Sequence, residues 1–460
     1  MSRLLGRVAF VTAIITTGSA AFALPFDSFD PRSMAMGGAG VAVGDAAMAP
    51  FFNPALLAVT DIDDDFSINL PVVGARIYDP EDFEDSLTAF QDAGYLDSLD
   101  GHIQNYNYAA YPTSNDLRLI ASDASTLSTQ LTTLNDKPLQ MEAGAALVMA
   151  IPSRKFGGAF YANGWAVGGA VANYRDDATL QEFTDTLNAV ADCYDTNAVI
   201  PGSCNPVTDI PNYSTYFDAT TGDVTFDSTD LKSSVDMRGV TVTETGVALA
   251  RQFGEGAGSW TLGITPKYVK LRLYEYRADV KSADTEDFDG DDYKAEYSHT
   301  NFDIGLAKNY NNGWRSGFVI KNVIAHTYDF KNVPRDPLTN TPLPDAASVS
   351  TGTTLNLKPQ ARLGVSHQNK WSTVALDVDL TDNDPAGFEK RTRYIALGGE
   401  LNGWDWVQLR AGYRINTFDS ARNVASLGLG LAAAGTLHID VAMANSSNET
   451  GAALQLGLQF

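Results

Sequence analysis

The sequence predicts an all-β fold, a transmembrane antiparallel β-barrel of the outer-membrane type with about 14 strands, an N-terminal plug and a helical extracellular loop. Three observations lead to this prediction. Apolar and polar residues alternate along many runs, the connections between runs are alternately long and short, and an export signal precedes a chain without long apolar helices. Outer-membrane barrels combine these properties.

The last ten residues give the clearest strand pattern. Residues of one parity are apolar, namely Ala452, Leu454, Leu456, Leu458 and Phe460. Residues of the other parity are small or polar, namely Gly451, Ala453, Gln455, Gly457 and Gln459. Successive side chains of a strand point to opposite faces, so this strand has one apolar face. In a barrel that face contacts lipid, and the small and polar residues face the lumen.

Similar runs recur upstream. They lie near 65–77, 140–151, 163–176, 236–253, 258–282, 292–310, 313–330, 353–368, 371–382, 391–402, 405–418, 422–433, 435–446 and 450–460. The connections after odd-numbered runs include long ones, whereas most connections after even-numbered runs are short. Barrels have long external loops and short periplasmic turns, and an even strand count places both termini in the periplasm.

Residues 1–23 have the pattern of a signal peptide, with Arg3 and Arg7 before a short apolar stretch and Ala21-Phe22-Ala23 before the expected cleavage after Ala23. No other stretch reaches about 18 uninterrupted apolar residues, the length of a membrane-spanning helix. We therefore expect the cell outer membrane as the location. The expected partners are outer-membrane lipid and lipopolysaccharide, together with the barrel-assembly machinery that inserts such proteins.

The composition of the chain excludes some classes of function. The chain has 460 residues, 19% of them charged, and a formal net charge of −24. We expect no nucleic-acid partner, because nucleic-acid binding requires a basic surface. The two cysteines, Cys193 and Cys204, share one polar segment, and in an exported protein this favours a disulfide over a metal pair that would lack a nearby histidine.

The segment Ser33–Leu57 is apolar and rich in small residues, yet it has neither strand alternation nor a helical stripe. Such a segment requires packing partners, and we expect it to lie inside the barrel as a plug, or hatch. The residues expected to form and hinge the hatch are Met34, Met36, Gly37, Gly38, Gly40, Phe52, Asn53, Pro54 and Ala55. Asn53-Pro54 is a turn signal.

Two motifs in this segment carry a resemblance. Arg32–Val41 and Phe52–Leu57 resemble the N-terminal hatch of the FadL/TodX family of outer-membrane transporters for hydrophobic compounds. The longer run Ala49–Ala58 more closely resembles the related outer-membrane family named "conjugal transfer protein TraF". The resemblance implies a fourteen-stranded barrel and a small hydrophobic ligand. The chain has no Cys-x-x-Cys motif, so nothing in it indicates redox activity.

The expected organisation is a signal peptide at 1–23, a hatch at 24–62 and a barrel at 63–460. The barrel contains a helical loop insertion at 78–139 and a disulfide loop at 177–235. Within the first insertion, Asn115–Asn135 has apolar residues at spacings of three and four, which predicts an amphipathic helix, and Glu81–Tyr106 is the expected helical partner. The two helices form either a hairpin packed on itself or on the barrel rim, or an apolar landing surface above the lumen for a hydrophobic ligand.

Charged residues on the expected lumen face form the second candidate site. The candidates are Arg362, Asp377, Asp379, Glu400, Arg410, Arg414, His438 and Asp440, and Lys267 and Arg272 also fit the pattern. Opposed charges inside a barrel would hold a hatch or line a path. Ser426, His438 and Asp440 leave a hydrolase triad open, but its geometry cannot be derived from sequence.

No cofactor or metal is expected. Asp287–Asp292 departs from the order of an EF-hand loop, so it is interpreted as an acidic hairpin tip with opportunistic cation binding as the alternative. The favoured function is a non-enzymatic barrel that binds or passes small hydrophobic molecules. The alternative is a structural surface component associated with conjugal transfer, in which the long acidic loops would be the working parts.

Overall fold

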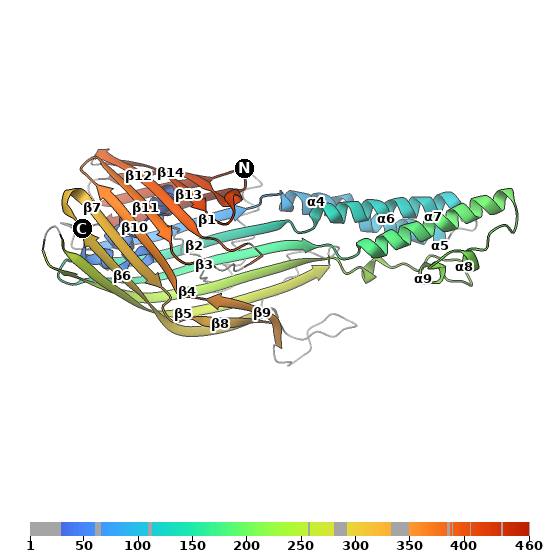
Figure 1. Cartoon of the computed structure of the whole chain (residues 1–460), viewed down its shortest axis with the longest axis horizontal. Helices are drawn as coiled ribbons and strands as arrows, with labels where there is room; N and C mark the ends of the chain where they lie inside the picture. Colours follow the sequence, from blue (N-terminus) through green and yellow to red (C-terminus); the bar gives the residue numbers. More distant parts are fainter. Residues whose placement is uncertain are drawn as a thin grey trace.

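The computed structural model describes residues 29–59, 66–108, 113–255, 258–279, 292–332, 349–383, 387–388, 390–404, 406–433 and 436–459. Its main feature is a closed antiparallel barrel (Figure 1). The wall strands are β1 (Ser67–Tyr78), β2 (Pro138–Ile151), β3 (Gly157–Asn173), β4 (Ser234–Phe253), β5 (Trp260–Asp279), β6 (Lys294–Asn309), β7 (Trp314–Lys321), β10 (Gln360–Gln368), β11 (Ser372–Asp379), β12 (Tyr394–Trp404), β13 (Val407–Asn416), β14 (Val424–Ala433), β15 (Leu437–Asn445) and β16 (Glu449–Gln459). Each wall strand pairs with its sequence neighbours in the barrel, and β1 closes against β16.

The strand faces follow the predicted alternation. On β16, Gly451, Ala453 and Gln455 are buried inside the barrel, whereas Leu454 and Leu458 are exposed on its outer surface. The same outer surface carries exposed apolar residues on every side, for example Ile264, Leu397 and Leu427. In water such a surface would be unfavourable, and in a bilayer it is the lipid-facing band. The predicted fourteen-stranded fold is confirmed.

Two of the predicted strands are longer than the strands of the structure. The runs 313–330 and 353–368 were each interpreted as one wall strand, but the wall strands end at Lys321 and begin at Gln360. The chain turns at Asn322, which has a φ of 53°, and forms a separate hairpin of β8 (His326–Asn332) and β9 (Val349–Leu357). We call β8 and β9 the inner hairpin. Its alternation is as regular as that of a wall strand, so periodicity alone could not separate the two.

Helices extend away from one end of the barrel, which is therefore the external end (Figure 1). They are α4 (Phe83–Ala93), α5 (Tyr95–Asn107), α6 (Ser114–Leu134), α7 (Asp177–Val199), α8 (Pro206–Asp209) and α9 (Tyr213–Tyr216), with the 3₁₀ turn η3 (Ser228–Asp230). We call residues 79–137 and 174–233 the helical projection. The helix predicted over Asn115–Asn135 is confirmed as α6. The apolar residues that predicted it are all buried: Leu117, Ile120, Ala124, Leu127, Leu131 and Leu134.

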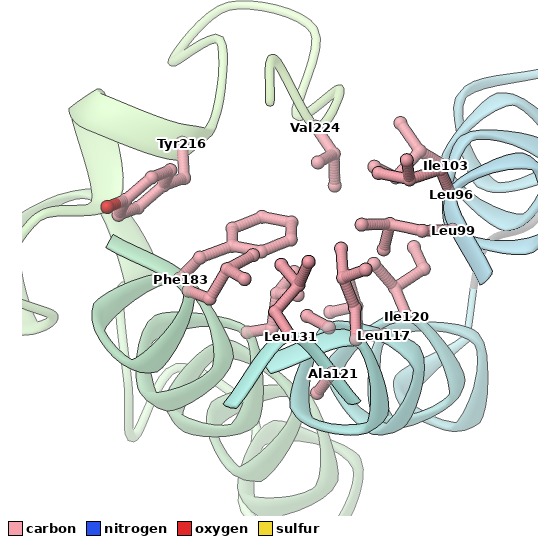
Figure 2. Close-up of a cluster of buried hydrophobic side chains, with 14 of the residues drawn as sticks. Leu96, Leu99, Ile103, Leu117, Ile120, Ala121, Leu131, Phe183, Tyr216 and Val224 are labelled. Atoms are coloured by element: carbon pink, nitrogen blue, oxygen red, sulfur yellow. The ribbon is translucent and has the colours of Figure 1, made fainter. Parts of the chain in front are cut away.

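The projection has a hydrophobic core of its own. Leu99 of α5, Leu117 of α6 and Phe183 of α7 meet in one fully buried cluster (Figure 2). The second loop contains the expected disulfide, and most of its first half is the 23-residue helix α7, which sequence reasoning did not predict. The signal was present in the sequence, because the apolar residues of α7 recur at spacings of three and four: Leu180, Phe183, Leu187, Val190 and Ala191. Cys193 and Cys204 are joined by a disulfide at the far end of α7, with their Cα atoms 5.6 Å apart.

Some sequence predictions lie outside the described residues, among them the signal peptide and most of the acidic tip Asp287–Asp292. Among the described residues, no helix is both long and apolar enough to cross a membrane.

Candidate functional site

The N-terminal segment, residues 29–59, lies inside the barrel. It forms short turns rather than long helices: α2 (Pro31–Ala35), η1 (Ala46–Met48), α3 (Ala49–Phe52) and η2 (Pro54–Ala58). The carboxylate of Asp30 caps α2, that of Asp45 caps η1, and the side chain of Asn53 caps η2. Nearly all of its side chains are buried against the inward-facing residues of the wall. Their neighbours belong to strands all around the barrel, which places the segment in the lumen.

Glycines of the wall make room for the segment. A Cβ atom built at any of several inward-facing glycines would lie within 3 Å of a segment atom; these are Gly74, Gly144, Gly157, Gly263, Gly305, Gly317, Gly398, Gly412 and Gly428. Real Cβ atoms do not make such contacts, so any side chain at these positions would displace the segment. Sequence reasoning interpreted small inward residues only as lumen lining. Their fit to the segment depends on strands far apart in sequence.

Hydrogen bonds fix the middle of the segment to the wall. The Asp377 carboxylate accepts hydrogen bonds from the backbone N–H groups of Gly40 and Val41, at 2.8 and 2.9 Å. The Asn53 amide donates to the carbonyls of Val41 and of Leu306 on β6, both at 3.0 Å. Asn53 therefore joins two parts of the segment to each other and to the wall.

The expected hinge glycines have different roles. Gly37 and Gly38 have φ values of 69° and 95°, so they form the turn after α2 in a conformation that favours glycine. Gly40 does not have a positive φ; it allows the ring of Phe52 to approach closely. Met34, Met36, Phe52, Pro54 and Ala55, also expected in the hatch, are buried within the segment.

A buried ion cluster connects the start of the segment to the wall. The Arg32 guanidinium makes two hydrogen bonds to the Glu400 carboxylate, at 2.9 and 3.0 Å. Arg410 also donates to Glu400 at 2.7 Å and pairs with Asp440 on β15. Two arginines and two carboxylates thus alternate, so charges that would be unfavourable alone are compensated.

The other candidate lumen residues are also brought inward. Arg362 pairs with Asp379 at 2.5 Å and donates to the carbonyl of Gly38 at 3.2 Å. Arg414 pairs with Glu449 at 2.6 Å, and His438 lies on β15 in the same inward register as Asp440. Lys267 is buried between Glu244 and Asp303. Arg272 is the exception, because it lies on the outer face of β5.

The hydrolase alternative does not fit the register. Ser426 pairs with Ala444, whereas His438 pairs with Ala432, so the two side chains lie six residues apart along the sheet, roughly 20 Å. The Ser426 hydroxyl is occupied by the segment: it donates to the carbonyl of Ala35 and accepts from the N–H of Gly37, both at 3.1 Å. These residues do not form a catalytic triad.

The external half of the lumen contains an apolar surface. Inward-facing Val240, Val242, Val269, Leu271 and Leu273 of β4 and β5 are fully buried and form a continuous aliphatic surface, whereas the interiors of channel barrels are typically polar. The inner hairpin covers them with Tyr328, Phe330, Leu355 and Leu357. At the base of the hairpin the Tyr328 hydroxyl bonds to Nδ1 of inward-facing His299 at 2.7 Å. Sequence reasoning missed this surface.

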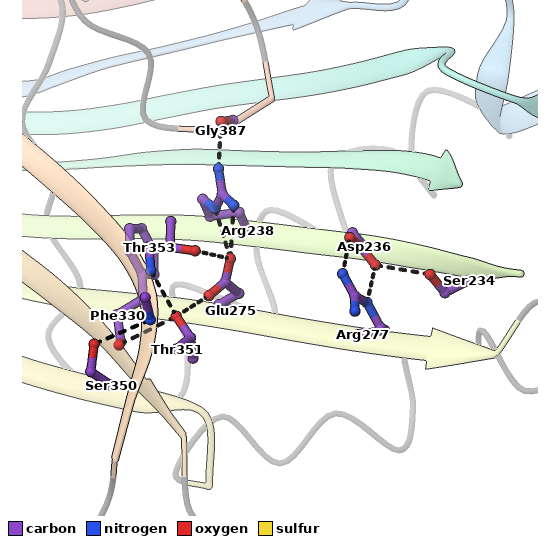
Figure 3. Close-up of polar contacts among 11 residues, drawn as sticks. Ser234, Asp236, Arg238, Glu275, Arg277, Phe330, Ser350, Thr351, Thr353 and Gly387 are labelled. Atoms are coloured by element: carbon purple, nitrogen blue, oxygen red, sulfur yellow. Dashed lines mark hydrogen bonds and ion pairs between the residues drawn. The ribbon is translucent and has the colours of Figure 1, made fainter. Parts of the chain in front are cut away.

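Arg238 of β4 fastens the inner hairpin in place (Figure 3). It pairs with Glu275 of β5 at 2.7 Å, and Glu275 in turn accepts hydrogen bonds from the hydroxyls of Thr351 and Thr353 on β9. Arg238 also donates to the carbonyl of Gly387, in the connection between β11 and β12, at 3.2 Å. Arg238 therefore joins the wall to the inner hairpin, through Glu275, and to the segment between β11 and β12.

Comparisons with known proteins show which fold the chain resembles and which family it belongs to. Its fold is similar to that of the toluene transporter TbuX of Ralstonia pickettii, with 14% sequence identity, 95% of this chain and 99% of that chain covered, and a TM-score of 0.50. A FadL homologue of Pseudomonas aeruginosa matches with 13% identity, 96% of this chain and 99% of that chain covered, and a TM-score of 0.47. The toluene transporter TodX of P. putida matches with 10% identity, 95% of this chain and 99% of that chain covered, and a TM-score of 0.45. No curated protein sequence matches the chain. Residues 50–379 match the family model described as "F plasmid transfer operon, TraF, protein", so the chain belongs to this TraF family.

Proposed function

We propose that the protein binds and passes small hydrophobic molecules across the outer membrane. The observation that carries this proposal is the inward-facing apolar surface of β4 and β5 beneath the inner hairpin. A lumen for ions or sugars would be lined by polar groups and water. Movement of the hairpin would expose apolar side chains, and their burial by a ligand would recover about 25 cal/mol for each Å². TbuX, whose fold is similar, is a toluene transporter, which supports the same class of ligand here.

The N-terminal segment would act as the hatch on the periplasmic side of this surface. A ligand released from the apolar surface next meets the segment, and the polar contacts of Asp377 and Glu400 hold that segment closed. Because these contacts are discrete hydrogen bonds and ion pairs, a local shift of the segment could open a path without unfolding the wall. We further propose that residues 1–23 are a signal peptide removed after Ala23, and that the barrel-assembly machinery inserts the chain.

Uptake of labelled toluene and of a labelled fatty acid into vesicles containing the purified protein tests the proposal. Val242 faces inward and Thr243, its neighbour on β4, faces outward. We expect uptake by the wild type, a severalfold loss in Val242→Asn, and no change in Thr243→Asn. Heat-modifiable migration in electrophoresis would show that both barrels fold. Absence of uptake by the folded wild type would contradict the proposal.

A surface-structural role is the second candidate, and the composition of the projection favours it. Residues 79–137 and 174–233 contain 22 acidic and 4 basic residues, so this region carries most of the net charge of the chain. Removing the external part of the projection distinguishes the two roles. The transport proposal predicts that uptake into vesicles persists, whereas the structural proposal predicts no uptake in either form and loss of a conjugation-associated surface phenotype.

A further inference from the structure

Three cations on the outer face of the wall surround one carboxylate. The ammonium of Lys270, the guanidinium of Arg272 and the ammonium of Lys294 lie 3.1, 2.9 and 3.4 Å from the carboxylate oxygens of Glu296. Lys270 and Arg272 belong to β5, and Lys294 and Glu296 to β6. The group has a local excess of two positive charges in a chain whose net charge is −24.

The position of these cations relative to the membrane follows from the sequence of outward-facing residues. Along β5 the exposed outward residues Trp260, Leu262, Ile264 and Tyr268 form the lipid-facing band, and Lys270 and Arg272 are the next two outward residues. On β6 the band ends at Phe302, and Thr300 and Ser298 follow before Glu296. The cations therefore lie just beyond the external edge of the band, at the level of lipid headgroups.

The chemistry of the neighbouring side chains favours an anion at this place. Thr243 on β4 and Ser298 on β6, the register neighbours of Lys270, are uncharged. The side chains of Lys270 and Lys294 keep 38% and 25% of their surface exposed, so a headgroup can reach them beside Glu296. A phosphate has several acceptor oxygens and binds lysine and arginine by charge-assisted hydrogen bonds.

We propose that Lys270, Arg272 and Lys294 bind a phosphate group of the lipopolysaccharide in the external leaflet. The bound glycolipid would cover the outer face of the extended strands β4–β6, where they rise above the lipid-facing band. The site lies outside the lumen, so this proposal does not depend on the proposed transport.

The test measures lipopolysaccharide bound to the full-length barrel. The probes are purified phosphorylated lipid A and the same lipid A after phosphatase treatment, added to detergent-solubilised protein freed of lipid and detected by mass spectrometry. The test variant is Lys270→Gln/Arg272→Gln/Lys294→Gln. The matched control is Arg251→Gln/Lys308→Gln, because these two cations lie outward on β4 and β6 at the periplasmic end of the band.

We expect the wild type and the control variant to retain phosphorylated lipid A equally, and the triple variant to retain about tenfold less, because charge-assisted contacts are lost. Dephosphorylated lipid A should bind all three proteins as weakly as the triple variant binds the phosphorylated form. Equal binding of phosphorylated lipid A by the triple variant, or of both lipids by the wild type, would overturn the proposal. Heat-modifiable migration verifies that each variant folds. The single change Lys270→Gln perturbs the barrel less, and we expect it to reduce retention of phosphorylated lipid A severalfold.

Discussion

The helical projection and the N-terminal segment are both fully buried in places, but by different physical means. The projection buries leucines, phenylalanines and tyrosines of its own helices against one another, as a water-soluble protein does. The segment also buries large side chains, among them Met36, Met48 and Leu57, but it packs them against the wall rather than against a core of its own. Wall glycines leave room for its backbone, and carboxylates and arginines hold it. The projection therefore carries its own stability, whereas the segment derives its order from the wall.

The largest expected effect is in the projection core. Phe183→Ala removes a fully buried ring of α7 and should destabilise the projection by about 3–5 kcal/mol. Hydrogen exchange measured on the full-length protein should accelerate in α6 and α7 but not in the wall. Leu119→Ala on the exposed side of α6 is the control, with little change expected. Equal acceleration in the wall would show that the projection is not a separate unit.

The next effect is in the ion cluster of the segment. Glu400→Gln leaves Arg32 and Arg410 without the carboxylate that both contact, so the closed segment should lose about 3 kcal/mol. Faster hydrogen exchange and protease cleavage within residues 31–43 are the measurements. Arg393→Gln removes a more exposed pair with Asp382 and should leave the segment unchanged. An unchanged segment in Glu400→Gln would mean that packing alone retains it.

Two neighbouring glycines of β12 test the packing contacts. A Cβ atom at Gly398 would lie 2.5 Å from the Cβ and carbonyl oxygen of Met36, whereas one at outward-facing Gly399 has its nearest neighbour at 4.0 Å. Gly398→Ala should therefore destabilise the closed segment by about 1–3 kcal/mol, and Gly399→Ala should not. The readout is protease access to the segment in folded barrels. Equal behaviour of the two variants would contradict the assigned contacts.

The smallest effect concerns acid sensitivity of the projection. Hydrogen bonds from Ser114 and Arg118 hold the pKa of the Asp195 carboxyl below its usual value. Because the pKa of Asp195 is lower in the folded than in the unfolded state, its ionised carboxylate stabilises the projection at pH values above the unfolded-state pKa, about 4. This stabilisation is lost as the pH falls through the folded-state pKa. Asp195→Asn should therefore slightly flatten the acid dependence of projection unfolding, measured by hydrogen exchange. An unchanged acid profile would indicate that this exposed pair is screened by solvent.

Sequence periodicity was sufficient for α6 and for most of the wall, but not for the ends of β7 and β10. Gly451–Gln459 alternates with period 2 because one face meets lipid, and Ser114–Leu134 repeats every three to four residues because one face meets a core. The same reasoning placed the charged residues of β10–β15 inside the barrel before any partner was known. These features depend on local sequence, so they were predictable.

Other features depend on contacts between distant residues. The inner hairpin alternates like a wall strand, and its inward direction depends on the backbone turn at Asn322 and on the bonds of Asn301 and Asp303 to the chain beyond β7. The fit of Met36 to Gly398 and Gly412 joins positions more than 350 residues apart. Neither feature leaves a local pattern that a single sequence would show.

The central claim is that the N-terminal segment closes the lumen of a folded barrel. Conductance across a planar bilayer tests it most directly, on the wild type and on a variant lacking residues 29–59 whose wall folding is verified by heat-modifiable migration. The account predicts no sustained ion conductance for the wild type and open-pore conductance for the deletion variant. Sustained conductance of the wild type, or a folded deletion variant that stays closed to ions, would contradict it.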